Sequence, residues 1–158
     1  MNRYLKSIIR ILSIFFVVAV ASNESEAQTY VYRGNSTYSS DILYTWNGRN
    51  LFRRHSTYRS DILYTWDGRH LYKGNSTYSS DILYTWDGEY LYRGKNKYRS
   101  DILFTWDGKH IYRGANKYRS DIVYTWDGKS LYRGNSTYRS DILYNVNGSF
   151  PVILFAIL

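Results

Sequence analysis

Short stretches of alternating apolar and polar residues return every 20 positions along this chain. From Val31 onward each repeat holds Asp-Ile-Leu-Tyr-Thr-Trp or a close variant, then Asp-Gly or Asn-Gly, then an apolar and aromatic pair. β-Branched and aromatic residues lie on both sides of the Asp-Gly or Asn-Gly pair, and no stretch shows the hydrophobic period of a helix. The pattern predicts an all-β domain of six tandem hairpins. The repeats are residues 31–50, 51–70, 71–90, 91–110, 111–130 and 131–150.

The Asp-Gly and Asn-Gly pairs predict the hairpin turns. A type I′ turn needs positive φ at both central residues, which Gly and the short Asx side chains tolerate best. A two-residue turn of this kind would place Trp66 opposite Arg69 and Tyr64 opposite Leu71. The predicted turns are Asn47-Gly48, Asp67-Gly68, Asp87-Gly88, Asp107-Gly108, Asp127-Gly128 and Asn147-Gly148.

Each hairpin should have two unlike faces, because side chains alternate across a strand. One face recurs between repeats with only apolar replacements, and its large aromatics can each bury about 150 to 250 Å². This face is the predicted core. In the second repeat it holds Ile62, Tyr64, Trp66 and Leu71, whereas Leu63, Thr65, His70 and Tyr72 lie on the other face.

Links rich in Gly, Asn, Ser and Thr join one hairpin to the next. The second link has Arg54 and His55 in place of Gly-Asn, so a strict need for positive φ at the Gly position is not expected. One aspartate ends every link. Calcium needs 6 to 8 oxygen ligands, and a single carboxylate per repeat supplies few, so we expect Asx turns rather than metal sites. These residues are Asp41, Asp61, Asp81, Asp101, Asp121 and Asp141.

Repeated hairpins can form a linear meander, a stacked solenoid, or a radial flower or barrel. Stacking would line the link aspartates into a ladder about 4.8 Å apart, and like charges that close are destabilising. A radial arrangement is therefore preferred, with the linear meander as the alternative. The segment Phe-Thr-Trp-Asp-Gly-Lys-His-Ile-Tyr at 104–112 also resembles the repeat of the β-flower proteins. These are small bacterial proteins, and the resemblance implies hairpins placed around a pseudo-symmetry axis. A looser likeness to the Tyr-, Trp- and Gly-rich MORN repeats is an analogy only.

The two ends of the chain differ from the repeats. Arg3, Lys6 and Arg10 precede or flank an apolar run that is too short to span a bilayer, so residues 1–27 are predicted to be a signal peptide, cleaved after Ala21 or, preferably, Ala27. We therefore expect a secreted protein, located in the periplasm, at the cell surface or outside the cell, with no transmembrane span after cleavage. The domain would cover 28–158, with 151–158 as a capping strand.

Composition limits the chemistry. The chain has no cysteine and a net charge of +8, which becomes +7 when the leader takes away three cations and two glutamates. An exported basic protein meets anionic glycans or other polyanions. No nucleophile elbow, phosphate loop or zinc spacing occurs, and the histidines occupy variable positions. We therefore expect no enzyme, no catalytic residue, no cofactor and no metal.

The predicted binding surface is a repeated Tyr/Arg face, because tyrosine and arginine are typical of contact surfaces. Aromatic rings can stack on sugars, while guanidinium groups pair with carboxylate, sulfate or phosphate. The leading hypothesis is a secreted or cell-envelope module that binds a glycan or another polyanion, and the alternative is a structural, self-associating envelope protein. A glycan hydrolase that uses two repeat carboxylates ranks third. The candidate ligand-binding residues are Tyr72, Tyr92, Tyr112, Tyr132, Arg93, Arg99, Arg113, Arg119, Arg133 and Arg139.

Overall fold

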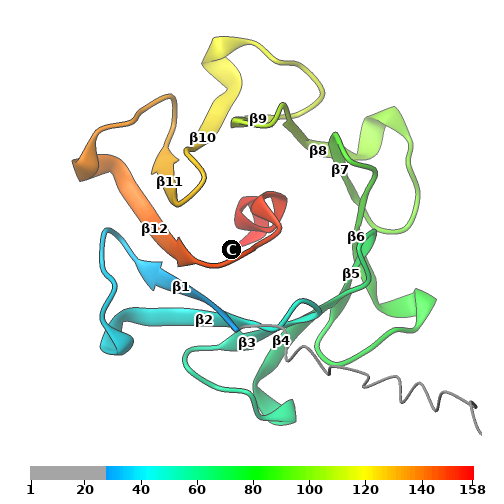
Figure 1. The fold of residues 1–158 in the computed structure, drawn as a ribbon. Coiled ribbons are helices and arrows are strands. Elements are labelled where there is room, and N and C mark those ends of the chain that lie inside the picture. Colours follow the sequence, from blue (N-terminus) through cyan, green and yellow to red (C-terminus); the bar gives the residue numbers. More distant parts are fainter. Residues whose placement is uncertain (1–27) are drawn as a thin grey trace, which may run out of the picture.

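The computed structural model describes residues 28–158. Twelve antiparallel strands close into a barrel around a central axis, as Figure 1 shows, and every strand in it pairs with a neighbour on each side. The predicted all-β, radial arrangement is confirmed. The strands are β1 (Thr29–Arg33), β2 (Ile42–Trp46), β3 (Asn50–Arg53), β4 (Ile62–Trp66), β5 (His70–Lys73), β6 (Ile82–Trp86), β7 (Tyr90–Arg93), β8 (Ile102–Trp106), β9 (His110–Arg113), β10 (Ile122–Trp126), β11 (Ser130–Arg133) and β12 (Ile142–Asn147).

Six links project outward from the barrel as petals (Figure 1). We call residues 34–41, 54–61, 74–81, 94–101, 114–121 and 134–141 petals 1 to 6. Each petal ends in one 3₁₀ turn: η1 (Ser39–Asp41), η2 (Arg59–Asp61), η3 (Ser79–Asp81), η4 (Arg99–Asp101), η5 (Arg119–Asp121) and η6 (Arg139–Asp141). The barrel therefore has a petal end and, where the strands of each hairpin join, a turn end.

The chain ends make the sixth strand pair. β12 pairs with β1, so that Val31 lies opposite Val146 and Tyr30 opposite Asn147. Asn147-Gly148 is therefore not a hairpin turn, and the prediction of six such turns is wrong at this position. Gly148 has φ +118, and a Cβ there would collide with the Thr29 hydroxyl. Glycine at this position lets the chain leave the wall beside β1.

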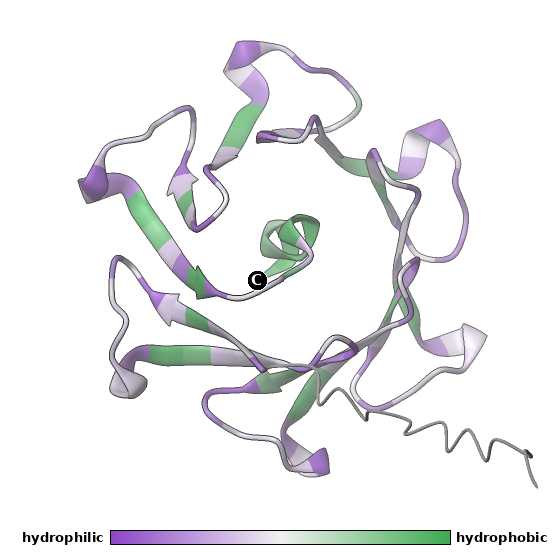
Figure 2. Cartoon of the chain, in the orientation of Figure 1, coloured by the Kyte–Doolittle hydropathy of each residue, from purple (hydrophilic) through white to green (hydrophobic). Residues whose placement is uncertain are grey.

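The C-terminal segment, residues 151–158, fills the barrel, and we call it the plug. After Gly148 the chain turns inward and forms the 3₁₀ helix η7 (Val152–Ile157), which lies on the axis and is apolar (Figure 2). Ile153, Leu154 and Phe155 are almost fully buried there. The prediction of a capping strand at 151–158 is wrong. An apolar octapeptide can pack from all sides inside a closed barrel, where no strand edge remains for it to join.

The inward face carries one aliphatic residue per repeat. Val31, Leu51, Leu71, Leu91, Ile111 and Leu131 have at most 1% of their surface exposed, and the inward tryptophans and tyrosines pack against the same cluster. Tyr64, Trp66 and Leu71 thus belong to the core as predicted. A register shift between Leu71 and Tyr72 places Ile82 opposite the outward-facing Tyr72. The bulge therefore moves this isoleucine off the predicted core face.

The hairpin turn lies one residue later than predicted. Trp66 is opposite Leu71 and Thr65 is opposite Tyr72, so that Gly68-Arg69 forms the centre of the turn. Gly68 has positive φ, but neither Asp67 nor Arg69 does, which excludes type I′ at both the predicted and the observed centre of the turn. The pairing moves by two residues, an even number, so it does not exchange the faces of Tyr64 and Trp66.

A buried threonine fixes the base of each of five petals. Thr65 Oγ1 donates a hydrogen bond to the Gly74 carbonyl at 2.8 Å, and Thr45 donates to the Arg54 carbonyl at 2.7 Å. The residue that accepts this bond adopts positive φ in each of these five petals, including Arg54, at φ 55. The expectation that this position lacks a positive-φ requirement is therefore wrong, and Arg54 is the residue that bears the strain.

No helix in residues 28–158 is long and apolar enough to cross a membrane.

We expect Arg54→Gly to stabilise the protein, because a side chain in the left-handed region costs roughly 1 to 2 kcal/mol. Chemical denaturation should show an increase in the free energy of unfolding of about 1 kcal/mol. Gly74→Ala is the matched control, since Gly74 has φ +57 at the same position of the next petal. It should destabilise the protein by a similar amount. Equal stability of all three proteins would contradict the strain at Arg54.

Phe155→Ala should destabilise the barrel strongly. The Phe155 ring stacks on Tyr144 at 5.3 Å and lies 4.7 Å from the Phe150 ring, and truncation of a buried phenylalanine costs about 3 to 5 kcal/mol. Leu158→Ala, at the partly exposed end of the same segment, should have a much smaller effect. Thermal unfolding of the two variants tests whether the plug supports the wall, and equal losses would argue that it does not.

Candidate functional site

The four predicted tyrosines lie on the outer face but are buried. Tyr72, Tyr92 and Tyr112 are each 7% exposed and Tyr132 is 8% exposed. Their hydroxyl groups are also committed: Tyr72 donates to Asp67 Oδ2 at 2.7 Å, and the other three make the same contact. These rings cannot offer a stacking surface to a polymer. They close the second face of the sheet.

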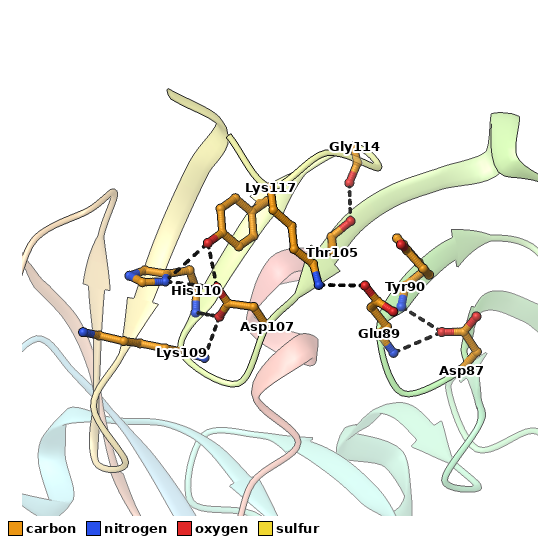
Figure 3. Close-up of polar contacts among 10 residues, drawn as sticks. Asp87, Glu89, Tyr90, Thr105, Asp107, Lys109, His110, Gly114 and Lys117 are labelled. Carbon is orange, nitrogen blue, oxygen red and sulfur yellow. Dashed lines mark hydrogen bonds and ion pairs between the residues drawn. The ribbon is translucent and has the colours of Figure 1, made fainter. Parts of the chain in front are cut away.

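The turn aspartates organise these contacts (Figure 3). Asp107 Oδ1 accepts the backbone N–H groups of Lys109 at 2.8 Å and His110 at 2.6 Å, while Oδ2 accepts the Tyr112 hydroxyl at 2.6 Å. The first repeat has Asn47 at this position and Phe52, which has no hydroxyl, in place of the tyrosine. In this chain the turn residue is therefore aspartate in the repeats where a tyrosine hydroxyl group donates a hydrogen bond to the second carboxylate oxygen.

This network shifts the pKa values of both partners. Burial alone would raise the pKa of Asp67, but hydrogen bonds from the His70 N–H, the Tyr72 hydroxyl and the Arg69 N–H outweigh it and lower that pKa to about 2. The pKa of Tyr112 rises to about 12, first through its hydrogen bond to Asp107 and then through burial. At neutral pH these shifts keep the Asp67 carboxyl group ionised and the Tyr112 hydroxyl group protonated. The network is structural.

The link aspartates have a structural role as well. Asp41 Oδ2 accepts a hydrogen bond from the Ser36 hydroxyl at 2.6 Å, and the Asp41 N–H donates to the Tyr38 carbonyl at 2.9 Å. The serine oxygen in turn accepts the Tyr38 N–H at 3.2 Å. The same bond occurs at Asp61, Asp81 and Asp141, so in four petals the carboxylate binds a serine hydroxyl rather than the backbone N–H groups of an Asx turn. Petals 4 and 5 have asparagine in place of this serine and lack the bond. Within residues 28–158 no three His, Cys, Asp or Glu side chains gather as a metal site.

This petal geometry exposes one tyrosine per repeat, which the sequence analysis missed. Each lies directly before the 3₁₀ turn of its petal and projects into solvent, with 66 to 76% of its surface exposed. Their presence in all six links, where only the final serine and aspartate are equally constant, is the signal that could have revealed them. They are Tyr38, Tyr58, Tyr78, Tyr98, Tyr118 and Tyr138.

Four of the exposed tyrosines are followed by an arginine, and three of these were predicted as ligand contacts. Arg99, Arg119 and Arg139, with Arg59, open the 3₁₀ turns and are exposed. With its amide oxygen toward Arg59, Asn75 of the next petal accepts hydrogen bonds from that guanidinium. Between petals 4 and 5 a groove of about 270 Å³ brings the predicted Tyr92 and Arg99 together with Tyr90 and Lys97.

The other predicted arginines form a different feature. Arg93 lies opposite Tyr84 in the register, as Arg113 lies opposite Phe104, so these cations share the inward side and not the face of the neighbouring Tyr92 and Tyr112. The predicted single Tyr/Arg face is therefore wrong at these positions. The same place is occupied by a cation in all six strands that lead into petals: Arg33, Arg53, Lys73, Arg93, Arg113 and Arg133.

We call these six residues the cation ring. All are exposed, and none of the ion pairs found in residues 28–158 involves them. The pair between Lys117 Nζ and Glu89 Oε1, at 2.7 Å, instead joins petal 5 to the turn after β6 (Figure 3). The petal end of the barrel thus presents six positive charges around the axis, with an outer circle of exposed tyrosines.

The closed barrel of hairpins and outward petals defines a flower-type all-β protein. The model of the 6-fold beta flower protein family matches residues 31–158. The chain belongs to this family, which confirms the resemblance inferred from its repeats. No curated protein matches the chain significantly, and no solved structure does. The family is a structural fold and supplies no reaction.

The turn network predicts a specific acid sensitivity. The pKa of Asp67 is lowered in the folded state, so its contribution to stability is present above the ordinary aspartate value of about 3.9 and is lost as pH falls toward 2. The pKa values of Asp87, Asp107 and Asp127 are lowered for similar reasons. We expect the free energy of unfolding to fall between about pH 4 and pH 2.

Asp67→Asn should reduce this loss, because an amide can still accept both backbone N–H groups, as Asn47 does, but does not take up a proton in this range. Tyr72→Phe should reduce it less, since the backbone bonds to the carboxylate remain. Urea titrations at pH 2, 4 and 7 give the comparison. A pH slope that is the same in both variants and in the parent would refute the assignment to this network.

Proposed function

We propose that the protein is a non-enzymatic binding module for an extracellular polyanion, such as an anionic glycan, and that it binds through its petal end. The observation that carries this proposal is the cation ring, in which six side chains of one sign surround one axis without an ion pair in residues 28–158. Keeping six like charges at one rim of a barrel opposes folding through repulsion. An anionic ligand would offset that repulsion.

The charge is distributed unevenly between the two ends. The petals and the strand ends next to them carry fourteen Lys or Arg residues against six aspartates, whereas the hairpin turns carry four cations against five acidic residues. The net positive charge of residues 28–158 therefore lies in the petals and the strand ends next to them, although one of these cations, Lys117, pairs with Glu89 of a hairpin turn. A field of this kind attracts polyanions and orients them toward one side of the protein.

The exposed tyrosines supply a second kind of contact. Aromatic rings can stack on sugar faces, and adjacent guanidinium groups pair with sulfate or carboxylate. Tyr98 and Arg99, and their counterparts in petals 2, 5 and 6, combine the two groups. Repetition around the axis favours a repeating polymer, because a second contact forms at high effective concentration once the first has formed.

The predicted signal peptide agrees with an extracytoplasmic ligand, although residues 1–27 lie outside the part that the structure describes. Self-association remains the alternative. Every strand in the barrel is paired on both sides, so association through sheet edges is not favoured, and the exposed tyrosines would have to provide the contact. A concentration series in analytical ultracentrifugation separates the two proposals, since a monomer at high concentration argues against the second.

The central test compares two triple variants of equal charge. Replacing Arg93, Arg113 and Arg133 by Gln at the petal end should lower the salt concentration at which the protein elutes from immobilised heparin. The slope of log affinity against log salt should fall by roughly two to three, as for the loss of three contacts to an anionic polymer. Replacing Arg49, Arg69 and Lys129 by Gln at the turn end removes the same charge and should change the slope far less.

A third variant, with Tyr98, Tyr118 and Tyr138 replaced by Ser, should weaken binding to anionic polysaccharide without changing the salt slope. Equal effects of the petal-end and turn-end charge variants would mean that net charge alone retains the protein, and the proposal would then fail.

A further inference from the structure

The turn end of the barrel holds a pocket of about 620 Å³, on the side away from the cation ring. It arises where the six-fold pattern breaks. The sixth repeat has no hairpin turn, because β12 continues into Gly148, Ser149 and Phe150 and the chain turns inward. The sixth repeat also has Val146 where the other five have tryptophan. The pocket therefore occurs at one place on the rim and is built in part from residues outside the repeats.

The pocket combines indole rings with uncharged polar groups. Trp46 and Trp66 line it together with Phe150, and the Trp46 and Phe150 rings meet edge to face at 5.7 Å. Both indoles are largely buried in the wall, so their positions are set before any ligand binds. The polar part of the lining comes from Gln28, Thr29, Asn147 and Ser149.

The hydrogen-bonding groups at this rim are partly uncommitted. Thr29 Oγ1 donates to the Ser149 carbonyl at 2.9 Å, and Gln28 Oε1 accepts the Tyr30 hydroxyl. Within residues 28–158 the Asn147 amide and the Ser149 hydroxyl make no side-chain hydrogen bond to another residue. No buried side-chain oxygen or nitrogen in this part of the chain lacks a partner. Asn147 and Ser149 are exposed, so their side chains can exchange hydrogen bonds with water for hydrogen bonds with a ligand.

The lining contains no charged residue, although more than a fifth of the chain is charged. An anion or cation that enters would lose hydration without gaining a partner. A neutral ligand with an apolar face and several hydroxyl groups would gain contacts with the indoles, the amide and the serine. A pocket of this size with an aromatic lining and a few placed polar groups suits one small molecule.

We propose that this pocket binds a neutral pyranose, with its hydroxyl groups at Asn147 and Ser149 and its C–H groups against the small exposed parts of Trp46, Trp66 and Phe150 that line the pocket. This site is separate from the polyanion surface in position and in chemistry. One end of the barrel would bind charge along a polymer, and the other would bind a single uncharged sugar ring.

The experiment titrates the purified protein with neutral glucose, galactose and mannose oligosaccharides, one at a time, while recording tryptophan fluorescence and the indole N–H signals in NMR spectra. Sodium chloride at 0.5 M suppresses contacts at the petal end, since the screening length is then a few ångströms. Heparin binding at low salt is measured in parallel. Loss of heparin binding with retained sugar binding, or the reverse, tells the two proposals apart.

Trp66→Phe and Asn147→Ala should each weaken sugar binding roughly 3- to 10-fold, as for the loss of one good contact. The repeats provide a matched control in Trp106→Phe, because Trp106 occupies the same position of its repeat as Trp66 but does not line the pocket. It should leave the affinity unchanged. Absence of binding by every neutral oligosaccharide would overturn the proposal, as would an equal loss in the Trp106 variant or a preference for benzyl alcohol over sugars.

Discussion

The pairing of β12 with β1 is the contact on which the rest of the structure depends. Five hairpins are joined by local turns, but the sixth pair unites strands more than a hundred residues apart. It removes the last free strand edges, encloses the inward aromatics, and leaves the final residues with no place in the wall. Their apolar side chains then fill the interior, where Phe155 contacts rings from β12 and β10. The plug thus packs against the inner side of the closed wall.

Closure also explains why the two ends of the barrel differ. At the petal end every repeat contributes one cation and one exposed tyrosine. Six repeats around the axis therefore form a circle of six cations and a circle of six tyrosines. At the turn end the chain termini interrupt the pattern and create one place unlike the others. Symmetric surfaces suit extended, repetitive ligands because each repeat can offer the same contact. A break in symmetry gives a pocket that one molecule can occupy.

Much of this fold could be predicted from the sequence. The hairpins, their radial arrangement and the inward position of Tyr64, Trp66 and Leu71 follow from the repeat and its alternation. The turn type could not be settled, because Asp67 serves as a hydrogen-bond acceptor with ordinary φ while Gly68 alone supplies positive φ. The bulge beside Tyr72 shifts the pairing locally. It could not be predicted, because the sequence of one repeat does not reveal how its strands pair with those of the neighbouring hairpin.

The candidate site was harder to predict, for the same reason. Tyr72 and Lys73 are adjacent in sequence but lie on opposite faces, and Tyr72 is buried with its hydroxyl group bonded to Asp67. The barrel wall buries what a lone hairpin would expose. The exposed Tyr98 could be predicted only by asking which link residues recur in all six repeats. The plug and the pocket depend on closure between distant segments, which local pattern cannot encode.

The remote strand pair has a consequence for how the chain reaches its native state. Contacts between distant segments slow folding, because loop closure costs entropy before the contact forms. Neither partner can finish the barrel until the last strand has been synthesised and has found the first among five similar competitors. A strand equivalent to β12 could pair in the wrong register or with another molecule, as in domain swapping. β12 differs from the other strands at Val146, which lies opposite Val31 of β1, and it alone is followed by the plug. These non-repeated residues therefore favour the pairing of β12 with β1 over pairing with a similar strand.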